Sequence, residues 1–257
     1  MMFKPKIIAF VCTWSLSAGM GIVDHPKVRG CPKVRIVRVM CVGEISPTII
    51  METFAKGADG VLVVGCHPPD CHFIRGNLLA ERRIEILKEL ISLTGLEPVR
   101  LQLNWAFPTE NEHFVKLIDD FRNRLRVLGP SPLARKRPDT NILINIKAAK
   151  MAAEDFRIRD LIGKEKNLTE KENRFKEKMS HEEFYALLRE AIKVEFTRQK
   201  IRLLTKERPM SVSEIAALIN MKTSLVLRHI VNMRRKGMIT LDHVEKTTPI
   251  FKALEVR

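Results

Sequence analysis

Short apolar runs mark the first half of the chain, and longer amphipathic segments separate them. Residues 61–64 are Val, Leu, Val and Val, a run that is typical of a strand buried on both faces of a sheet. Residues 6–11 (KIIAFV) and 34–40 (VRIVRVM) predict two similar strands, and the alternating VRLQLNW of residues 99–105 predicts a fourth.

The segments between these strands have the spacing of helices. Ser46 is a predicted N-cap, Pro47 occupies the first helical position, and Gly57 is a predicted helix end. Residues 77–95 and 110–128 repeat apolar side chains every three or four positions. Strands that alternate with helices predict an α/β fold, an open parallel sheet of about four strands with flanking helices.

The pattern changes in the second half. Residues 129–140 (GPSPLARKRPDT) are rich in proline, which predicts a linker after a first domain of residues 1–128. Residues 141–205 have helical character, and a separate C-terminal domain is expected over residues 206–257.

Within this C-terminal domain, two short helices precede a hairpin. Ser211 and Glu214 form a capping-box pattern at the start of the first helix, and Gly237 ends the second. Residues 238–242 and 249–254 are expected to pair as antiparallel strands. This order resembles the winged helix-turn-helix modules of prokaryotic transcription regulators.

Composition narrows the class of protein. The chain has 257 residues, 45% of them hydrophobic, which is enough for a folded core. Its apolar runs are far shorter than the roughly 20 residues of a membrane-spanning helix, and its N-terminus lacks the features of a signal peptide. An odd number of cysteines, five, favours metal binding or redox chemistry over disulfides. We therefore expect a cytoplasmic protein with no membrane partner.

The net charge of +15 is unevenly distributed. Residues 129–257 hold 28 Lys and Arg against 17 Asp and Glu, so this half suits nucleic acid or an acidic protein partner. The second helix of the C-terminal domain carries four of these cations: Arg228, Arg234, Arg235 and Lys236.

Cysteines follow three of the predicted strands. Cys12, Cys41 and Cys66 each stand where a strand ends, and Cys71 follows on a stiff two-proline turn in the sequence GCHPPDCH. Because the carboxyl ends of parallel strands meet at one edge of a sheet, these four thiols are expected to gather there. The sequence therefore predicts a metal site, in preference to cysteines that serve as small core residues.

The metal itself has two candidates at this point. Thiolates are soft ligands that suit iron, but zinc is a rival because His67 and His72 stand beside the two turn cysteines. We expect His67 and His72 to be exposed or to support the ligands, and not to bind the metal themselves. Trp14 and Trp105 fall near the same edge, where they could shield the site. The chain contains no nucleophile–base set, phosphate-binding loop or paired carboxylates in a recognisable motif, so independent catalysis is not expected.

Several segments together resemble a known family. KIIAFVCTW, VRIVRVMCVGEISP, KGADGVLVVGCHPPDCHFIRGN and AERR are similar to the delta subunit of methyl-viologen-reducing hydrogenase, over roughly residues 6–128. The resemblance implies a [2Fe-2S] cluster with its ligands among Cys12, Cys41, Cys66 and Cys71. It also implies a non-catalytic subunit of a methanogenesis complex, which relays electrons from a hydrogenase or formate dehydrogenase to the flavin-containing A subunit of heterodisulfide reductase.

One position departs from the family pattern. The family usually has C-x-W-C, whereas this chain has Cys12-Thr13-Trp14-Ser15. Four thiols remain at the matched positions, the number that a [2Fe-2S] cluster needs, and Ser15 or Cys31 could replace the missing ligand.

Two functions are therefore compared. The preferred one is the electron relay, with the basic second half docked on a partner subunit. The alternative is a redox-sensing, DNA-binding transcription regulator with an iron-sulfur or zinc site, in which the winged-helix region binds DNA.

Overall fold

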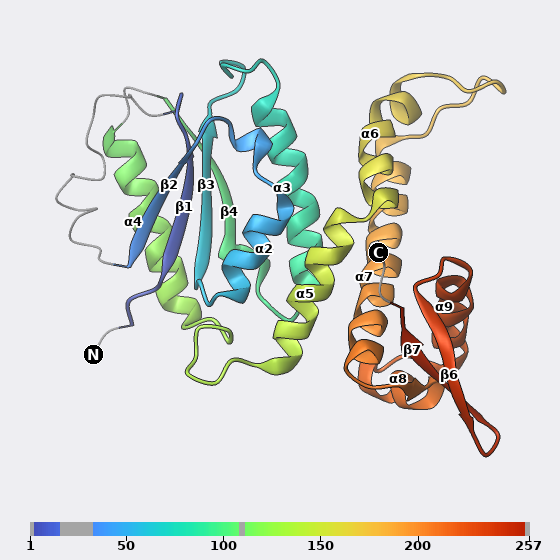
Figure 1. Cartoon of the computed structure of the whole chain (residues 1–257). Coiled ribbons are helices and arrows are strands. Elements are labelled where there is room, and N and C mark those ends of the chain that lie inside the picture. The colour runs from blue at the N-terminus through green and yellow to red at the C-terminus, as the bar shows by residue number, and fades with distance from the viewer. Residues whose placement is uncertain (1–2, 16–32, 108–110, 255–257) are drawn as a thin grey trace. The chain divides into compact units, whose positions relative to one another are not determined.

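A computed structural model describes residues 3–15, 33–107 and 111–254 (Figure 1). Its contacts divide the chain into two compact units, Met1–Glu154 and Asp155–Arg257, and each unit is described by itself.

The first unit is built on a four-stranded parallel sheet with the order β2-β1-β3-β4. The strands are β1 (Ile7–Cys12), β2 (Val34–Val39), β3 (Gly60–Cys66) and β4 (Leu101–Ala106). Every residue of β3 is buried because this strand lies inside the sheet and is covered on both faces. The predicted α/β class with an open parallel sheet of four strands is confirmed.

Helices cover both faces of this sheet (Figure 1). Helices α2 (Pro47–Ala55) and α3 (Gly76–Ser92) lie on one face, and α4 (Asn111–Leu128) lies on the other. Short 3-10 turns, η2 (Val42–Glu44) and η3 (Pro98–Arg100), follow β2 and precede β4. The core beneath α4 is made of alternate strand residues and the apolar side of the helix, including Ile7, Ala9, Val11, Leu62, Val64, Phe114, Ile118 and Phe121.

The local signals at α2 act as predicted. The Ser46 side chain accepts a hydrogen bond from the N–H of Thr48, and Pro47 occupies the first turn, where a missing N–H costs nothing. Gly57 follows the helix with φ of 84°, a conformation that glycine adopts without strain.

The segment expected as a linker belongs to the first unit. The buried carboxylate of Asp59 accepts N–H groups from Lys6 and Ser131, both at 2.8 Å. The buried guanidinium of Arg100 donates to the carbonyls of Asp59 and Gly129 at 3.1 and 3.2 Å. Residues near 130 are therefore held at the amino end of the sheet by buried hydrogen bonds.

Helix α5 (Thr140–Glu154) extends the first unit further. Its buried side packs against α2 and α3, Asn145 donates to the carbonyl of Thr94 at 3.1 Å, and Lys150 pairs with Glu52 at 2.9 Å. The division between the units consequently falls at Glu154, later than the residues 129–140 that the sequence suggested.

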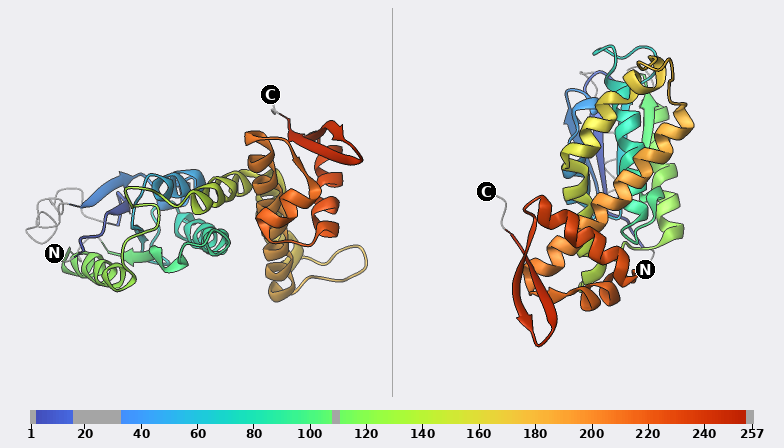
Figure 2. Two further views of the ribbon diagram at one scale, coloured as in Figure 1. Left: turned by 90° about the horizontal axis from the view of Figure 1, so that it is seen from below. Right: turned by 90° about the vertical axis from the view of Figure 1, so that its right-hand side faces the viewer.

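The second unit combines helices with a small antiparallel sheet. It contains α6 (Phe156–Glu170), α7 (His181–Glu207), β5 (Met210–Ser211), α8 (Val212–Ile219), α9 (Thr223–Arg235), β6 (Ile239–Glu245) and β7 (Thr248–Ala253). The strand order is β5-β7-β6, and the β6–β7 hairpin projects beyond α8 and α9 (Figure 2). The core joins α7, α8, α9 and the sheet through residues such as Ile201, Ile215, Ile230 and Phe251.

The predicted capping box of this unit is present. The Ser211 hydroxyl accepts the N–H of Glu214, whose carboxylate accepts the N–H of Ser211 at 2.8 Å. Over the residues that the structure describes, no helix is both long and apolar enough to cross a bilayer.

The Arg100 side chain allows a test of the hydrogen bonds at the amino end of the sheet. We expect Arg100→Met to lower the free energy of unfolding by about 2–4 kcal/mol, because it leaves buried carbonyls without donors. Trp14 and Trp105 are the two tryptophans of the chain and both lie in the first unit, so tryptophan fluorescence during urea unfolding measures this unit alone.

Lys150→Met is the matched control, since its ion pair with Glu52 is partly exposed and stabilises the fold less than a buried network does. If both variants lose the same free energy of unfolding, the buried hydrogen bonds of Arg100 stabilise the first unit no more than the exposed ion pair does.

Candidate metal centre

Three of the four candidate cysteines lie at the carboxyl edge of the sheet, as the sequence predicts. Cys12 is the last residue of β1 and Cys66 is the last residue of β3. Cys41 follows β2 by two residues and caps η2. The parallel register aligns Cys12 with Val39 of β2, so the three strand ends lie side by side.

Cys12 and Cys66 form the closest thiol pair. Their Sγ atoms lie 3.6 Å apart, and both side chains are buried. Two thiolates that share a tetrahedral metal through bonds of about 2.3 Å stand roughly 3.7 Å apart. The observed separation therefore fits two ligands of one metal atom.

Cys41 and Cys71 approach each other across the N-terminus of α3. A Cβ built on Gly76, the first residue of α3, would collide with the Cys41 Sγ and lie 3.3 Å from the Cys71 Sγ. Gly76 is itself packed against Gly43 of η2, where a Cβ would lie 2.8 Å from the Gly76 Cα. Two glycines thus allow η2 and α3 to come close enough to bring these sulfurs together.

The four sulfurs also form one electrostatic group. Burial raises the pKa of Cys41, a hydrogen bond from the Gly43 N–H lowers it, and electrostatic repulsion from Cys12 and Cys71 raises it. Burial raises the pKa of Cys66 to about 12, against a hydrogen bond from the His72 N–H, and Cys12 and Cys71 again act on it. These two thiols are accordingly protonated at neutral pH in the absence of a metal, and each has a backbone donor directed at its sulfur.

The two histidines near the turn are engaged with aromatic rings. The His72 ring stacks on Trp14 with centroids 3.5 Å apart, and the His67 ring stacks on Phe107 at 4.7 Å. His67 Nδ1 also lies 2.7 Å from the Pro68 carbonyl oxygen. Across the described part of the chain, no three His, Cys, Asp or Glu side chains are arranged to hold a single metal ion. The arrangement thus differs from a closed zinc site with histidine ligands.

Ser15 stands where the family pattern has a cysteine, and it is fully buried. Its hydroxyl donates to the carbonyl of Cys12 at 2.9 Å and lies 3.4 Å from the carbonyl of Val64. The hydroxyl therefore ties the ends of β1 and β3 together. Cys31, the other residue that the sequence suggested as a substitute ligand, lies outside the described residues.

Apolar side chains surround the site on its exposed side. Ile74 is 81% exposed with φ of 64°, and Met40, Phe73 and Trp14 are also exposed. Trp105 instead packs over β3, where its ring lies 2.7 Å from the position of a Cβ on Gly65. Of the two tryptophans, Trp105 covers the strand that carries Cys66, and Trp14 covers His72.

Sequence reasoning missed part of this arrangement. Gly43, Gly76, Met40 and Ile74 do not belong to any metal-ligand pattern, because their importance comes from contacts between distant segments. Gly76 at the first position of α3 carried no signal of its own, because glycine and the Asn77 that follows are both common at helix starts.

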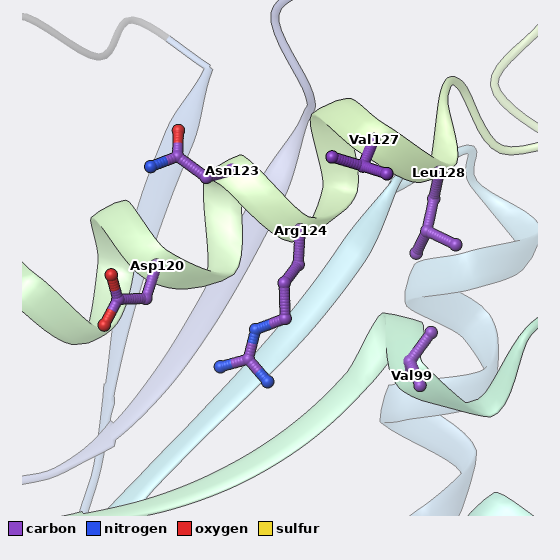
Figure 3. A pocket seen from close by; sticks show the side chains of 6 residues that line it. All are labelled: Val99, Asp120, Asn123, Arg124, Val127 and Leu128. Carbon is purple, nitrogen blue, oxygen red and sulfur yellow. The ribbon is translucent and has the colours of Figure 1, made fainter.

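A surface depression elsewhere in the first unit is unrelated to the cysteines (Figure 3). It lies beside the C-terminus of α4 and the start of β4, at the amino end of that strand, and Val127 on its rim is 90% exposed. Its lining consists of Val99, Asp120, Asn123, Arg124, Val127 and Leu128.

Comparison with known proteins identifies relatives of the first unit. The family model described as methyl-viologen-reducing hydrogenase, delta subunit, matches residues 7–129. The vhc iron-sulfur subunit of an F420-non-reducing hydrogenase from Methanococcus voltae is 37% identical over 136 residues, which cover 51% of this chain and 91% of that protein. The iron-sulfur subunit of an F420-non-reducing hydrogenase from Archaeoglobus profundus is 35% identical, with 52% and 97% covered.

A relative of a different size shares the same region. The ferredoxin/F420H2-dependent CoB-CoM heterodisulfide reductase of Methanosarcina acetivorans contains it in its A subunit, which is 39% identical over 126 residues. These residues make up 49% of this chain but only 16% of that protein, so the similar region is one part of a much longer polypeptide there.

The contact between Gly76 and the cysteines leads to a prediction. We expect Gly76→Ala to reduce bound iron to a small fraction of the wild-type content, because the new Cβ would displace the Cys41 and Cys71 sulfurs. Helix propensity alone would make the same change favourable by up to about 1 kcal/mol, so loss of iron reports packing and not helix formation. The measurement is iron per chain after anaerobic purification.

Gly163→Ala is the matched control. Gly163 is also helical, and a Cβ there meets nothing within 4 Å, so iron content should not change. Retention of iron by Gly76→Ala would contradict the packing argument.

Proposed function

The chain belongs to the methyl-viologen-reducing hydrogenase delta subunit family, and from this we propose that it is an electron-transfer subunit that carries a [2Fe-2S] cluster. The proposed ligands are Cys12, Cys41, Cys66 and Cys71. The observation that carries the proposal is the gathering of these thiols near one sheet edge, with the Cys12 and Cys66 sulfurs 3.6 Å apart and the Cys41 and Cys71 sulfurs both beside Gly76. Four thiolates are the ligand set that such a cluster requires.

Four cysteine ligands suit either an iron-sulfur cluster or zinc, so the choice of iron rests on the names of the relatives. The histidine rings nearby are stacked on aromatic side chains. The N–H groups of Gly43 and His72 already point at the Cys41 and Cys66 sulfurs. Such donors stabilise negative charge on iron-sulfur centres and raise their reduction potential. Relatives of the first unit are also named as iron-sulfur subunits.

When bound, the cluster would supply one-electron transfer. The residues of this chain would hold it, exclude water from three of its ligands and leave one side accessible. Cys12, Cys41 and Cys66 are buried, whereas Cys71 is half-buried on the turn. Because electron transfer slows steeply with distance, we place the exchange of electrons at the Cys71 side, beside Phe73 and Ile74.

The proposed partners follow from the same relatives. We propose a hydrogenase or a formate dehydrogenase as the electron donor and the flavin-containing A subunit of a heterodisulfide reductase as the acceptor. Relatives are named as hydrogenase subunits, and the same region is covalently part of the A subunit of a heterodisulfide reductase in Methanosarcina acetivorans. A region that functions inside one polypeptide must, as a separate protein, reach its partner by docking. The exposed apolar residues near Cys71 suit that contact.

The cofactor proposal is tested by metal content. Anaerobically purified protein should be brown and contain about two irons and two sulfides per chain, and reduction should give an EPR signal at low temperature. Colourless protein with one zinc per chain would refute the proposal.

The ligands are tested by alanine variants, because serine can itself bind iron. Cys66→Ala and Cys71→Ala should lose the iron, while Cys31→Ser should keep it and serves as the thiol control. Loss of iron from the Cys31 variant together with retention in Cys12→Ala would reverse the ligand assignment.

The electron-transfer route predicts a separate effect at Ile74. We expect Ile74→Asn to weaken binding of the A subunit roughly tenfold, the effect of losing about 1.4 kcal/mol at an apolar contact. Asparagine tolerates the positive φ of this position better than isoleucine, so the fold and the iron content should not change. The measurement is the concentration dependence of flavin reduction in anaerobic stopped-flow mixing.

Val127→Asn is the control, because Val127 is equally exposed but lies at the opposite end of the first unit. Equal rates for the wild type and the Ile74 variant would remove this surface from the proposed route.

A further inference from the structure

Helix α9 of the second unit presents an unusual concentration of positive charge. Lys222, Arg228, Arg234, Arg235 and Lys236 are all exposed, and residues 222–241 contain no Asp or Glu. Among the described residues, none of these five cations forms an ion pair, whereas Lys164, Lys193 and Arg208 of the same unit each pair with a carboxylate. A row of cations without local counter-charges is suited to a polyanion.

The two sides of α9 have different roles. Val226, Ile230 and Met233 pack into the core of the second unit. The exposed side carries a stripe at helical spacing, made of Ser224, Arg228, Asn232 and Arg235. Arg, Asn and Ser are side chains that hydrogen-bond to base edges or phosphates, and a single helix fits the major groove of B-form DNA.

The elements around α9 complete the arrangement. Asn220 ends α8 in a left-handed conformation, and a short turn leads into α9. The β6–β7 hairpin contacts α9 and exposes residues 241–249, with Lys246 at its tip in a positive φ of 56° (Figure 2). Of the acids on this hairpin, Asp242 is paired with Lys252 at 2.6 Å and with His243 at 2.8 Å, while Glu245 is exposed.

We propose that the second unit binds double-stranded DNA, with α9 in the major groove and the β6–β7 hairpin along the adjacent backbone. Two short helices, a turn and a hairpin form the arrangement by which winged helix-turn-helix modules meet a duplex. This activity lies outside the electron-transfer proposal and depends only on the second unit.

The surface favours DNA over the acidic partner protein considered from the sequence. Cores of protein interfaces are depleted of charge and rich in aromatic residues, whereas α9 and its two caps expose five cations and contain no Phe, Tyr or Trp. Exposed Leu227 and Val231 are compatible with contacts to thymine methyl groups. Duplex RNA is disfavoured because its deep, narrow major groove does not admit a helix.

The test uses the full chain, purified anaerobically, and a fluorescein-labelled 25-base-pair duplex of random sequence. The triple variant Arg228→Ala, Arg234→Ala, Arg235→Ala should bind roughly tenfold more weakly in anisotropy measurements at 0.1 M salt. The slope of log K against log salt concentration should fall by about 0.9 for each phosphate contact that is lost. Thermal melts establish that the variant is folded.

The matched control removes the same charge elsewhere in the unit. Lys171, Arg174 and Lys178 are exposed and lie in the segment that joins α6 to α7, so their triple alanine variant should keep the wild-type affinity within about twofold. A 25-base-pair RNA duplex and polyglutamate should compete poorly.

Three outcomes would overturn the proposal. If the two triple variants lose DNA affinity equally, the affinity depends on net charge and not on the α9 surface. Preference for the RNA duplex would exclude the major-groove geometry. Competition by polyglutamate as strong as by DNA at equal charge would assign the α9 surface to an acidic protein.

Discussion

The contact between Gly43 and Gly76 is the one on which the candidate site depends. A Cβ at either position would collide with the backbone or with a thiol, so the close approach of η2 and α3 requires glycine at both positions. The Arg83 side chain, one to two turns further along α3, donates to the Gly43 carbonyl and holds the same two elements together. This approach carries Cys41 and Cys71 toward each other, while the parallel register carries Cys12 toward Cys66.

Four thiols in one partly buried place are costly to ionise together. Burial and the neighbouring thiolates both raise the pKa values of Cys41 and Cys66, so a second or third negative charge is disfavoured there. A bound cationic centre removes this cost, because it replaces protons with metal–sulfur bonds. The backbone donors at Gly43 and His72 would then hydrogen-bond to the metal-bound sulfurs of Cys41 and Cys66.

The two units differ in how they use charge. In the first unit, the buried side chains of Asp59 and Arg100 hydrogen-bond to backbone groups, Arg100 also pairs with Glu97, and these contacts fix the end of the sheet opposite the cysteines. In the second unit, the cations of α9 are exposed and form no ion pair with any residue that the structure describes. The first pattern is typical of a structural network, and the second is typical of a surface that meets a charged ligand. Under the two proposals, one unit carries the redox chemistry and the other a separate recognition surface.

The sequence by itself determined the local features of this protein. Apolar runs set the four strands, Ser46 and the Ser211–Glu214 pair set two helix starts, and the placement of Cys12, Cys41 and Cys66 at strand ends followed from the same runs. These features depend on residues within a few positions of one another, which is why the sequence pattern contains them.

Tertiary structure alone decided the features that join distant segments. The proline-rich segment after residue 128 has the composition of a linker, but it is fixed to the first unit because the Ser131 N–H donates to Asp59 and the Gly129 carbonyl accepts from Arg100. The meeting of Gly43 with Gly76, and the stacking of His72 on Trp14, likewise join residues more than thirty positions apart. No local pattern encodes such contacts, because their free energy exists only after the sheet has brought its strand ends together.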